Sequence, residues 1–368
     1  MRRTRALLVG LVVVLATIGS SGIAGATAPG TAVAQTDDVE CTFPITATDA
    51  TGTDVTVAED PERIVTLGPS AAQTMWEIGA SDEVVGVTKY ASYLEGASAK
   101  QNISGGSSFV EVESVVALEP DLVLAPNIAE NATISKLRDA GLTVYKFERA
   151  KSMADIAQKT KFIGALTGNC GAGVKRAAEM NRTLAEIETA VQGEDSPAVL
   201  YYMGGGYTAG SNTFINKIIE TAGATNVASE AGIDGYGIIS EEVVLTQNPE
   251  WILTNSDIIT IPKTAGYNQT TAVKEGNILV LDANEVSQPA PRVVEVTKRL
   301  AHKFHPDAFD AGPVTNETDT TDGTTTTPIT TRTEGTGTSA PTTTTTPGMG
   351  ILSALGALAI LGLVRRTR

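Results

Sequence analysis

The sequence predicts an α/β protein of two Rossmann-like lobes, each with a central sheet, joined by a long rigid interlobe helix. Short apolar runs alternate with helical patterns along residues 41–309, which is typical of βα units around a parallel sheet. One sub-pattern occurs twice, at 113–124 and at 242–253, and reads glutamate, helix, proline, acidic residue, strand. No flexible linker separates the halves, so a helix should connect them and restrict hinge motion.

Residues 41–150 are expected to form the N-terminal lobe. Ser70 is a typical helix cap and Gly79 a typical helix stop, while Pro120 precedes an apolar strand and Gly141 ends another helix. The expected strands are 63–67, 84–87, 121–125 and 143–147, and the expected helices are 70–78, 110–118 and 134–140.

Residues 151–192 are expected to form the interlobe helix region. Ser152 caps a helical pattern that reaches Leu166, and a glycine-containing break follows. Apolar residues then recur at helical spacing over 174–191, which predicts the long helix.

Residues 193–309 show the same alternation of strands and helices and are expected to form the C-terminal lobe. Ser240 caps a short helix, and Pro249 precedes a strand as Pro120 does in the first half. The expected strands are 198–203, 251–254 and 278–281, the last entered through 271–274, and the expected helices are 214–222, 240–245 and 291–302.

Both ends of the chain carry export signatures. Residues 1–34 combine basic residues, an apolar run and Ala32-Val33-Ala34, which predicts a cleaved signal peptide; an uncleaved anchor is the alternative. Residues 310–347 are Thr-rich and predict a disordered stalk. Residues 348–368 combine an apolar run with a basic end, which predicts a membrane anchor. The protein should be exported and tethered to the outer face of the membrane through its C-terminus.

The C-terminal tail resembles the surface-sorting signals of archaeal proteins, in which a Pro-Gly motif precedes the apolar helix. That resemblance implies replacement of the helix by a lipid, although Met349 stands where a phenylalanine is usual. A retained helix is the simpler alternative, and both give a tethered protein.

The chain is acidic, with 42 acidic against 27 basic residues and a formal net charge of -15. Such a surface repels nucleic acid and excludes that class of partner. It suits a halophilic archaeon, and an ordinary acidic extracellular protein is the alternative. Five sequons favour a glycoprotein, and they begin at Asn102, Asn131, Asn181, Asn268 and Asn316.

Cys41 and Cys170 are the only cysteines. Two cysteines in an exported chain most simply form one disulfide bond, which would attach the mature N-terminus to the middle of the fold. A lipidated Cys41 and two free thiols are the alternatives, but polar, acidic residues precede Cys41 where a lipidation motif would lie.

Four stretches carry a family resemblance: 61–70, 118–125, 223–227, and Pro291-Arg292 followed by His305-Pro306. They resemble the helical-backbone class of periplasmic solute-binding proteins, which serve ABC importers of cobalamin, haem and ferric siderophores. The resemblance implies a ligand in the interlobe cleft and docking on permease subunits with their ATPases. Docking would use one acidic residue on each lobe, at Glu113 and Glu242. A glutamate in the first turn of a helix is also favoured by the helix dipole alone.

Candidate ligand contacts lie in loops that follow strands, where cleft residues belong. Tyr90 matches an aromatic residue that contacts corrinoid in relatives, and neutral amides at Asn284 and Gln288 favour a ligand with amide groups. We therefore expect cobalamin as the transported ligand, with no bound cofactor. Each tyrosine could instead serve core packing. The candidate set is Tyr90, Ser107, Phe109, Tyr207, Tyr236, Asn284 and Gln288.

Other functions fit the sequence less well. An anionic ferric siderophore would need several cleft cations, and Lys89 and Arg149 are the few candidates; haem is a further alternative. A stalked adhesin is usually β-rich, and a zinc or manganese binder needs more histidines than His302 and His305. No catalytic motif occurs, so an enzyme is not expected.

Overall fold

The computed structural model describes residues 41–310, except residues 107, 108 and 259. Both lobes belong to one compact unit of the chain. The predicted signal peptide, the predicted stalk beyond its first residue, the predicted anchor, Ser107 and Asn316 lie outside the described residues. Within the described part, no helix is long and apolar enough to span a membrane.

The N-terminal lobe contains the predicted parallel sheet, with strand order β5-β4-β3-β6-β7. All four predicted strands are present, and β5 extends one edge of the sheet. The strands are β3 (Ile64–Thr66), β4 (Val84–Val87), β5 (Gln101–Asn102), β6 (Leu122–Ala125) and β7 (Val144–Lys146). The helices are α1 (Pro69–Glu77), α2 (Val112–Val116) and α3 (Asn131–Asp139), with single 3-10 turns at Ser81–Glu83, Lys89–Ala91 and Ala97–Ala99.

An antiparallel hairpin that the sequence analysis did not predict precedes this sheet. It pairs β1 (Ile45–Thr48) with β2 (Asp54–Val57). Val55 and Val57 on β2 are buried in the core of the N-terminal lobe, whereas their neighbours on the strand are exposed. The hairpin therefore covers one side of the lobe with a single apolar face.

The N-cap of helix α1 lies two residues earlier than predicted. Gly68, not Ser70, is its N-cap, and Pro69 occupies the first turn. Proline suits this position because its missing N–H needs no partner there and its φ is already helical. A side chain at residue 68 would clash with Pro126, since a Cβ there would lie 2.8 Å from the proline Cγ. Ser70 therefore lies inside the first turn of the helix and does not cap it.

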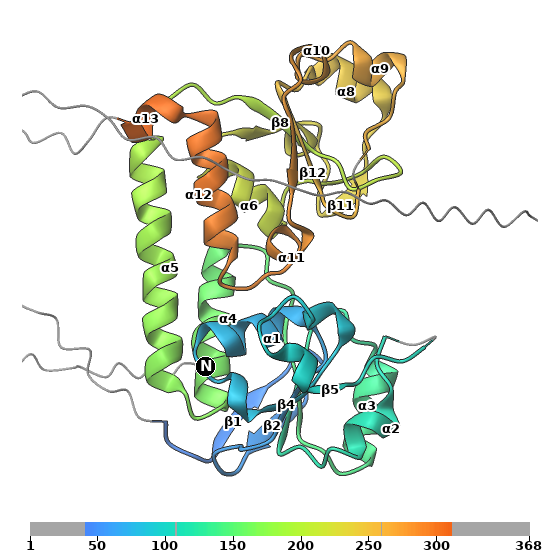
Figure 1. Ribbon diagram of the computed structural model, residues 1–368, viewed down its shortest axis with the longest axis vertical. Helices are drawn as coiled ribbons and strands as arrows, with labels where there is room; N and C mark the ends of the chain where they lie inside the picture. The colour runs from blue at the N-terminus through green and yellow to red at the C-terminus, as the bar shows by residue number, and fades with distance from the viewer. Residues whose placement is uncertain (1–40, 107–108, 259, 311–368) are drawn as a thin grey trace, which may run out of the picture. The chain divides into compact units, whose positions relative to one another are not determined.

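The interlobe region contains both predicted helices, separated by the predicted break, and the second is the long one. The pair consists of α4 (Met153–Leu166) and α5 (Cys170–Ala190), and Ser152 and Asp155 form the capping box of α4. They pack closely where Gly164 meets Gly173, since a Cβ on Gly164 would lie 2.9 Å from the Gly173 Cα. In Figure 1, α5 runs alongside both lobes.

Each helix of the pair contributes to both lobes. On α4, Ile156 lies in the core of the C-terminal lobe, and Ile163 lies in the core of the N-terminal lobe. Helix α5 starts beside the N-terminal lobe, and its Leu184 and Ile187 pack in the C-terminal core. The chain thus crosses between the lobes three times, which explains the absence of a flexible linker.

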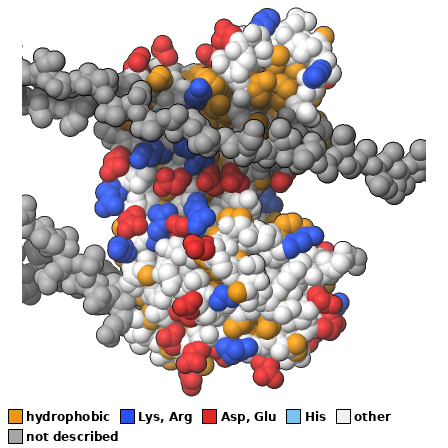
Figure 2. Space-filling view, viewed as in Figure 1, with side chains coloured by type: hydrophobic (Ala, Val, Ile, Leu, Met, Phe, Trp, Pro, Cys, Tyr) orange, Lys and Arg blue, Asp and Glu red, His pale blue; other side chains and the backbone are white. Residues whose placement is uncertain are grey.

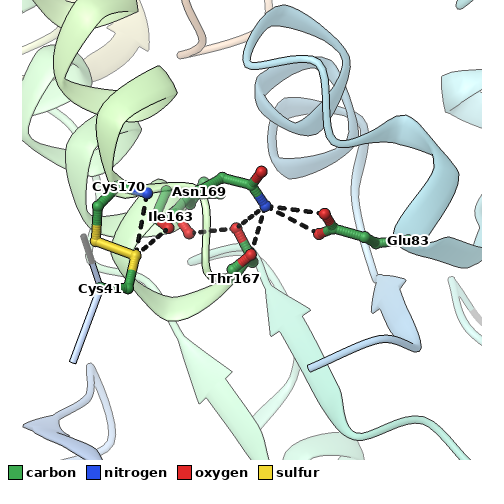
Figure 3. The surroundings of a disulfide bond; sticks show 7 residues. Cys41, Glu83, Ile163, Thr167, Asn169 and Cys170 are labelled. Atoms are coloured by element: carbon green, nitrogen blue, oxygen red, sulfur yellow. Dashed lines mark hydrogen bonds between the residues drawn. A yellow bond between two sulfur atoms is a disulfide. The ribbon is translucent and has the colours of Figure 1, made fainter. Parts of the chain in front are cut away.

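The predicted disulfide bond is present. Cys41 and Cys170 are bonded with their Cα atoms 5.5 Å apart, which attaches the start of the described chain to the first turn of α5 (Figure 3). Next to it, the Asn169 side chain donates to both carboxylate oxygens of Glu83, each at 3.0 Å. The bond and this contact hold the beginning of α5 to the N-terminal lobe.

The C-terminal lobe has a parallel sheet of order β10-β8-β12-β13 and a separate antiparallel pair, β9 and β11. The three predicted strands are present; β9, β10 and β11 were not predicted. The strands are β8 (Ala198–Tyr201), β9 (Tyr207–Ala209), β10 (Thr225–Asn226), β11 (Tyr236–Ile238), β12 (Trp251–Asn255) and β13 (Ile278–Leu281). The helices are α6 (Phe214–Thr221), α7 (Val227–Glu230), α8 (Glu241–Gln247), α9 (Ala265–Asn268), α10 (Thr271–Glu275), α11 (Ala283–Val286), α12 (Val293–Phe304) and α13 (Pro306–Asp310).

The repeated sub-pattern of the sequence is also repeated in the structure. Helix α2 leads into β6, and α8 leads into β12. Glu119 and Asn248 precede the two prolines, and both adopt a left-handed backbone conformation with φ of 44°. This conformation ends each helix and turns the chain into an inner strand of its sheet.

Candidate interlobe binding site

A cavity of about 430 Å³ lies between the lobes. The N-terminal lobe contributes the start of α1, which follows β3, and the loops after β4, β5, β6 and β7. All of these segments follow the carboxyl ends of parallel strands, where open α/β sheets bind ligands. The C-terminal lobe contributes residues from α6, β11 and the loop after α11. The lining residues are Pro69, Ser70, Tyr90, Phe109, Pro126, Asn127, Ile128, Arg149, Ala150, Phe214, Tyr236, Ser287, Gln288 and Pro289.

Two predicted aromatic residues form the wall on the N-terminal lobe. The rings of Tyr90 and Phe109 stack with centroids 5.3 Å apart and planes 14° apart. Both remain exposed, at 46% and 36%, and Ile128 beside them is 66% exposed. The Lys89 Nζ lies 5.2 Å from the centroid of the Tyr90 ring. The wall is therefore a flat apolar surface open to a ligand.

The wall on the C-terminal lobe comes from the β9–β11 pair. Tyr236 lies opposite Ala209, and Ile238 lies opposite Tyr207, so these four side chains share one face of the pair. Tyr236 lines the cavity, and burial raises the pKa of its phenol to about 12. Tyr207 does not line the cavity, but it continues the same face and is 51% exposed.

The structure separates the two predicted amides. Gln288 lines the cavity together with Ser287 and Pro289, whereas Asn284 does not. Asn284 lies in the short helix α11, where its backbone carbonyl accepts a hydrogen bond from the Gln73 side chain at 3.3 Å. Four of the seven candidates thus meet at the cavity: Tyr90, Phe109, Tyr236 and Gln288.

Sequence reasoning missed part of the lining. Pro126, Asn127 and Ile128, which follow strand β6, were not named as candidates. Arg149, which follows strand β7, was named only as a candidate cation for an anionic siderophore. Tyr90 was chosen because it lies in a loop that follows a predicted strand. These loops also follow predicted strands, so the same criterion could have identified their residues. Ser70 had been assigned to helix capping.

Arg149 is the one charged residue among the described residues that line the cavity. It is exposed, and within the described chain its guanidinium makes no hydrogen bond and no ion pair. The other polar lining side chains are neutral: Ser70, Tyr90, Asn127, Tyr236, Ser287 and Gln288. The cavity therefore suits a largely apolar ligand with neutral polar groups and few charges.

Polar contacts join the lobes beside the cavity. The Glu77 carboxylate on α1 binds Arg176 of α5 at 2.9 Å and Arg292, at the start of α12, at 2.7 Å. The Arg292 backbone N–H also donates to the Gln73 side chain at 3.0 Å. Figure 2 shows acidic and basic side chains interspersed over α5 and α12.

A partly buried lysine supports the C-terminal rim of the cavity. Lys159 on α4 donates a hydrogen bond from Nζ to the carbonyl of Pro289. Burial lowers the pKa of this lysine from 10.5 to about 8. The contact ties the loop that carries Gln288 to the helix pair.

The two candidate docking residues lie on different lobes. Glu113 is exposed in the first turn of α2, and Glu242 is exposed in the first turn of α8. Neither carboxylate has a partner among the described residues. Both are therefore available to a partner protein.

The two histidines do not form a metal site in the described part of the chain. The His302 ring stacks on Phe309 with centroids 3.9 Å apart, and His305 is buried with its Nε2 3.2 Å from the Gly223 carbonyl oxygen. Within the described residues, no group of three or more potential metal-binding side chains is present.

Comparison with known proteins places this geometry among characterised folds. Residues 64–285 match a family model described as periplasmic binding protein. A protein of Halobacterium salinarum named cobalamin-binding protein is 44% identical over 308 residues, covering 80% of this chain and 84% of that protein.

Two solved structures share the fold. One is the periplasmic heme-binding protein RhuT of Roseiflexus sp. RS-1, with a TM-score of 0.62, 26% identity, and coverage of 67% of this chain and 99% of that one. The other is the periplasmic vitamin B12 binding protein BtuF of Vibrio cholerae, with a TM-score of 0.58, 22% identity, and coverage of 68% and 98%. Both likenesses support the two-lobed α/β fold.

Proposed function

Because this chain belongs to the periplasmic binding protein family, we propose that it captures a corrinoid outside the cytoplasm and delivers it to an ABC importer. The observation that carries this proposal is the 44% identity, over 80% of the chain, to a protein named cobalamin-binding protein. Membership in a family of binding proteins also agrees with the sequence prediction that the chain is not an enzyme.

The geometry of the cavity supports a corrinoid. A corrin is a broad, flat macrocycle with peripheral amides, and flat apolar side chains face it best from two sides. The Tyr90–Phe109 pair offers one such face, and Tyr236 with its neighbours on β11 offers the other. A cavity of about 430 Å³ holds only part of so large a ligand, so the exposed Tyr207 would extend the contact surface.

Haem is the second candidate. A solved structure at 26% identity is named a heme-binding protein. Tyr90 and Tyr236 are the described lining residues with a phenol, a group that ligates haem iron in some proteins. Two carboxylates on haem, however, would meet a single charged residue in the cavity, which favours the corrinoid.

Delivery would use Glu113 and Glu242. An exposed carboxylate on each lobe can pair with arginines of a permease, and two such pairs fix the orientation of the bound protein. We also propose export by the N-terminal signal and tethering by the C-terminal segment, so that the binding body stays near the permease.

Calorimetric titration of the purified chain tests the ligand. We expect cyanocobalamin to bind at micromolar concentration or below, and haem and a ferric hydroxamate to bind more weakly. Tyr90→Ala should weaken cobalamin binding by about tenfold because it removes one aromatic face.

Val280→Ala is the matched control for this titration. Val280 is an exposed apolar residue on β13, at 53%, and does not line the cavity, so its replacement should leave affinity unchanged. Tighter binding of haem than of cobalamin by the wild-type chain would refute the corrinoid proposal and favour haem.

A further inference from the structure

The first turn of α1 opens onto the cavity without a cap. Its N-cap, Gly68, has no side chain to accept from the helix, and Pro69 and Ser70 line the cavity. The first N–H groups of a nine-residue helix carry partial positive charge and attract anions. The helix therefore presents an electropositive end to the ligand.

Ser70 is a second indication that a ligand binds at the first turn of α1. It is 8% exposed, so it is more than nine-tenths buried. Its hydroxyl makes no hydrogen bond to any other described residue, although it lines the cavity. This hydroxyl can therefore donate a hydrogen bond to an acceptor that is bound in the cavity.

Arg149 brings the only full charge among the described lining residues. It lies in the crossing segment between β7 and α4, and no acidic side chain neutralises it there. Its charge lowers the pKa of the Tyr236 phenol, although burial of the phenol has the larger and opposite effect. The guanidinium therefore acts on groups inside the cavity.

We propose that Ser70, the first turn of α1 and Arg149 form a subsite for one anionic group of the ligand. This inference rests on the proposed function and identifies that group as the phosphodiester in the nucleotide loop of a complete corrinoid. Cobalamin carries a single negative charge on this loop and neutral amides elsewhere, which matches one guanidinium. Arginine binds phosphate oxygens through two parallel hydrogen bonds, and Ser70 and the helix can satisfy the remaining oxygens.

The proposal predicts selection between two corrinoids. Dicyanocobinamide has the same macrocycle but lacks the nucleotide loop and its phosphodiester. Calorimetry on the purified chain should show tighter binding of cyanocobalamin than of dicyanocobinamide. Arg149→Gln should weaken cyanocobalamin binding by about tenfold or more, the usual range for a hydrogen-bonded charge, and should leave dicyanocobinamide within about twofold of wild type.

Several variants separate this subsite from general damage to the cleft. Arg149→Lys should retain part of the selectivity because it keeps the charge, and Ser70→Ala should reduce affinity for cyanocobalamin alone. Lys151→Gln is the matched control: it removes an equal charge two residues away, at a position that does not line the cavity, and should change neither affinity.

The outcomes are distinguishable. Equal weakening of both corrinoids in Arg149→Gln would overturn the phosphodiester subsite, as would unchanged binding of both. Failure of the wild-type chain to bind either corrinoid would instead refute the proposed function. Unchanged dicyanocobinamide binding in the variant also shows that the cleft is still folded.

Discussion

At the scale of single residues, Asp49 shows how a buried carboxylate stabilises the N-terminal lobe. Its side chain accepts hydrogen bonds from Thr51 and from the Lys146 backbone N–H, and it forms an ion pair with Arg138 at 2.6 Å. Burial alone would raise the pKa of Asp49, but these contacts outweigh it and lower the pKa from 3.8 to about 2. The charged form is therefore favoured by folding.

Asp49→Asn should lower the free energy of unfolding by about 2 kcal/mol at neutral pH, which follows from the size of the pKa change. Because the folded pKa is lowered, the wild-type stabilisation is complete above the ordinary value of 3.8 and is lost as pH falls through about 2. Urea unfolding of both proteins across this pH range measures the difference. A difference that stays constant down to pH 2 would contradict the electrostatic origin.

At the scale of elements, α1 is joined to both α5 and the start of α12 through Glu77. Its carboxylate lies between two guanidinium groups, and the side chains of Glu77, Arg176 and Arg292 are 15–34% exposed. Without the carboxylate, two like charges would face each other across the junction of the lobes. The three-residue cluster should therefore contribute more than an ordinary surface pair.

Glu77→Gln should lower the free energy of unfolding by about 1–2 kcal/mol, because partial exposure screens the charges. Glu285→Gln, which removes the more exposed pair with Arg299, is the control and should cost less than about 1 kcal/mol. Chemical denaturation of the two variants at low and high salt makes the comparison. Equal losses would show that the Glu77 cluster is no stronger than a surface pair.

At the scale of the whole molecule, the two halves present equivalent carboxylates. Glu113 and Glu242 occupy the same place in the repeated helix-proline-strand unit, one on each lobe. A permease that contacts both would hold the cleft in a fixed orientation over its pore. Ligand binding and delivery would then depend on different surfaces of the protein.

Replacement of Glu113 and Glu242 by lysine together should abolish corrinoid uptake by cells because the pairs with permease arginines become repulsive. Ligand affinity of the purified variant should remain unchanged, since neither residue lines the cavity. The control replaces Glu186 and Glu188, which are exposed on α5, by lysine and so changes the net charge equally. Undiminished uptake in the first variant would exclude the docking role.

Much of this molecule follows from its sequence. Alternating apolar runs predicted strands that are all present in the structure, and caps such as Ser152 and Ser240 located main helices. These signals are readable in the sequence because they act within a few residues. The duplicated unit indicated two lobes, and Cys41 with Cys170 indicated the disulfide bond. The shape of the fold and its family were therefore determined locally along the chain.

Tertiary structure alone decided which residues meet. It separated Asn284 from Gln288, although only three positions lie between them, because α11 directs one to α1 and the following loop directs the other to the cavity. It converted Ser70 from an expected cap into a buried lining residue, because Pro126 leaves room only for glycine at the true cap. Contacts of this kind join segments distant in sequence, and their geometry is set by packing within and between the lobes, which no local pattern encodes.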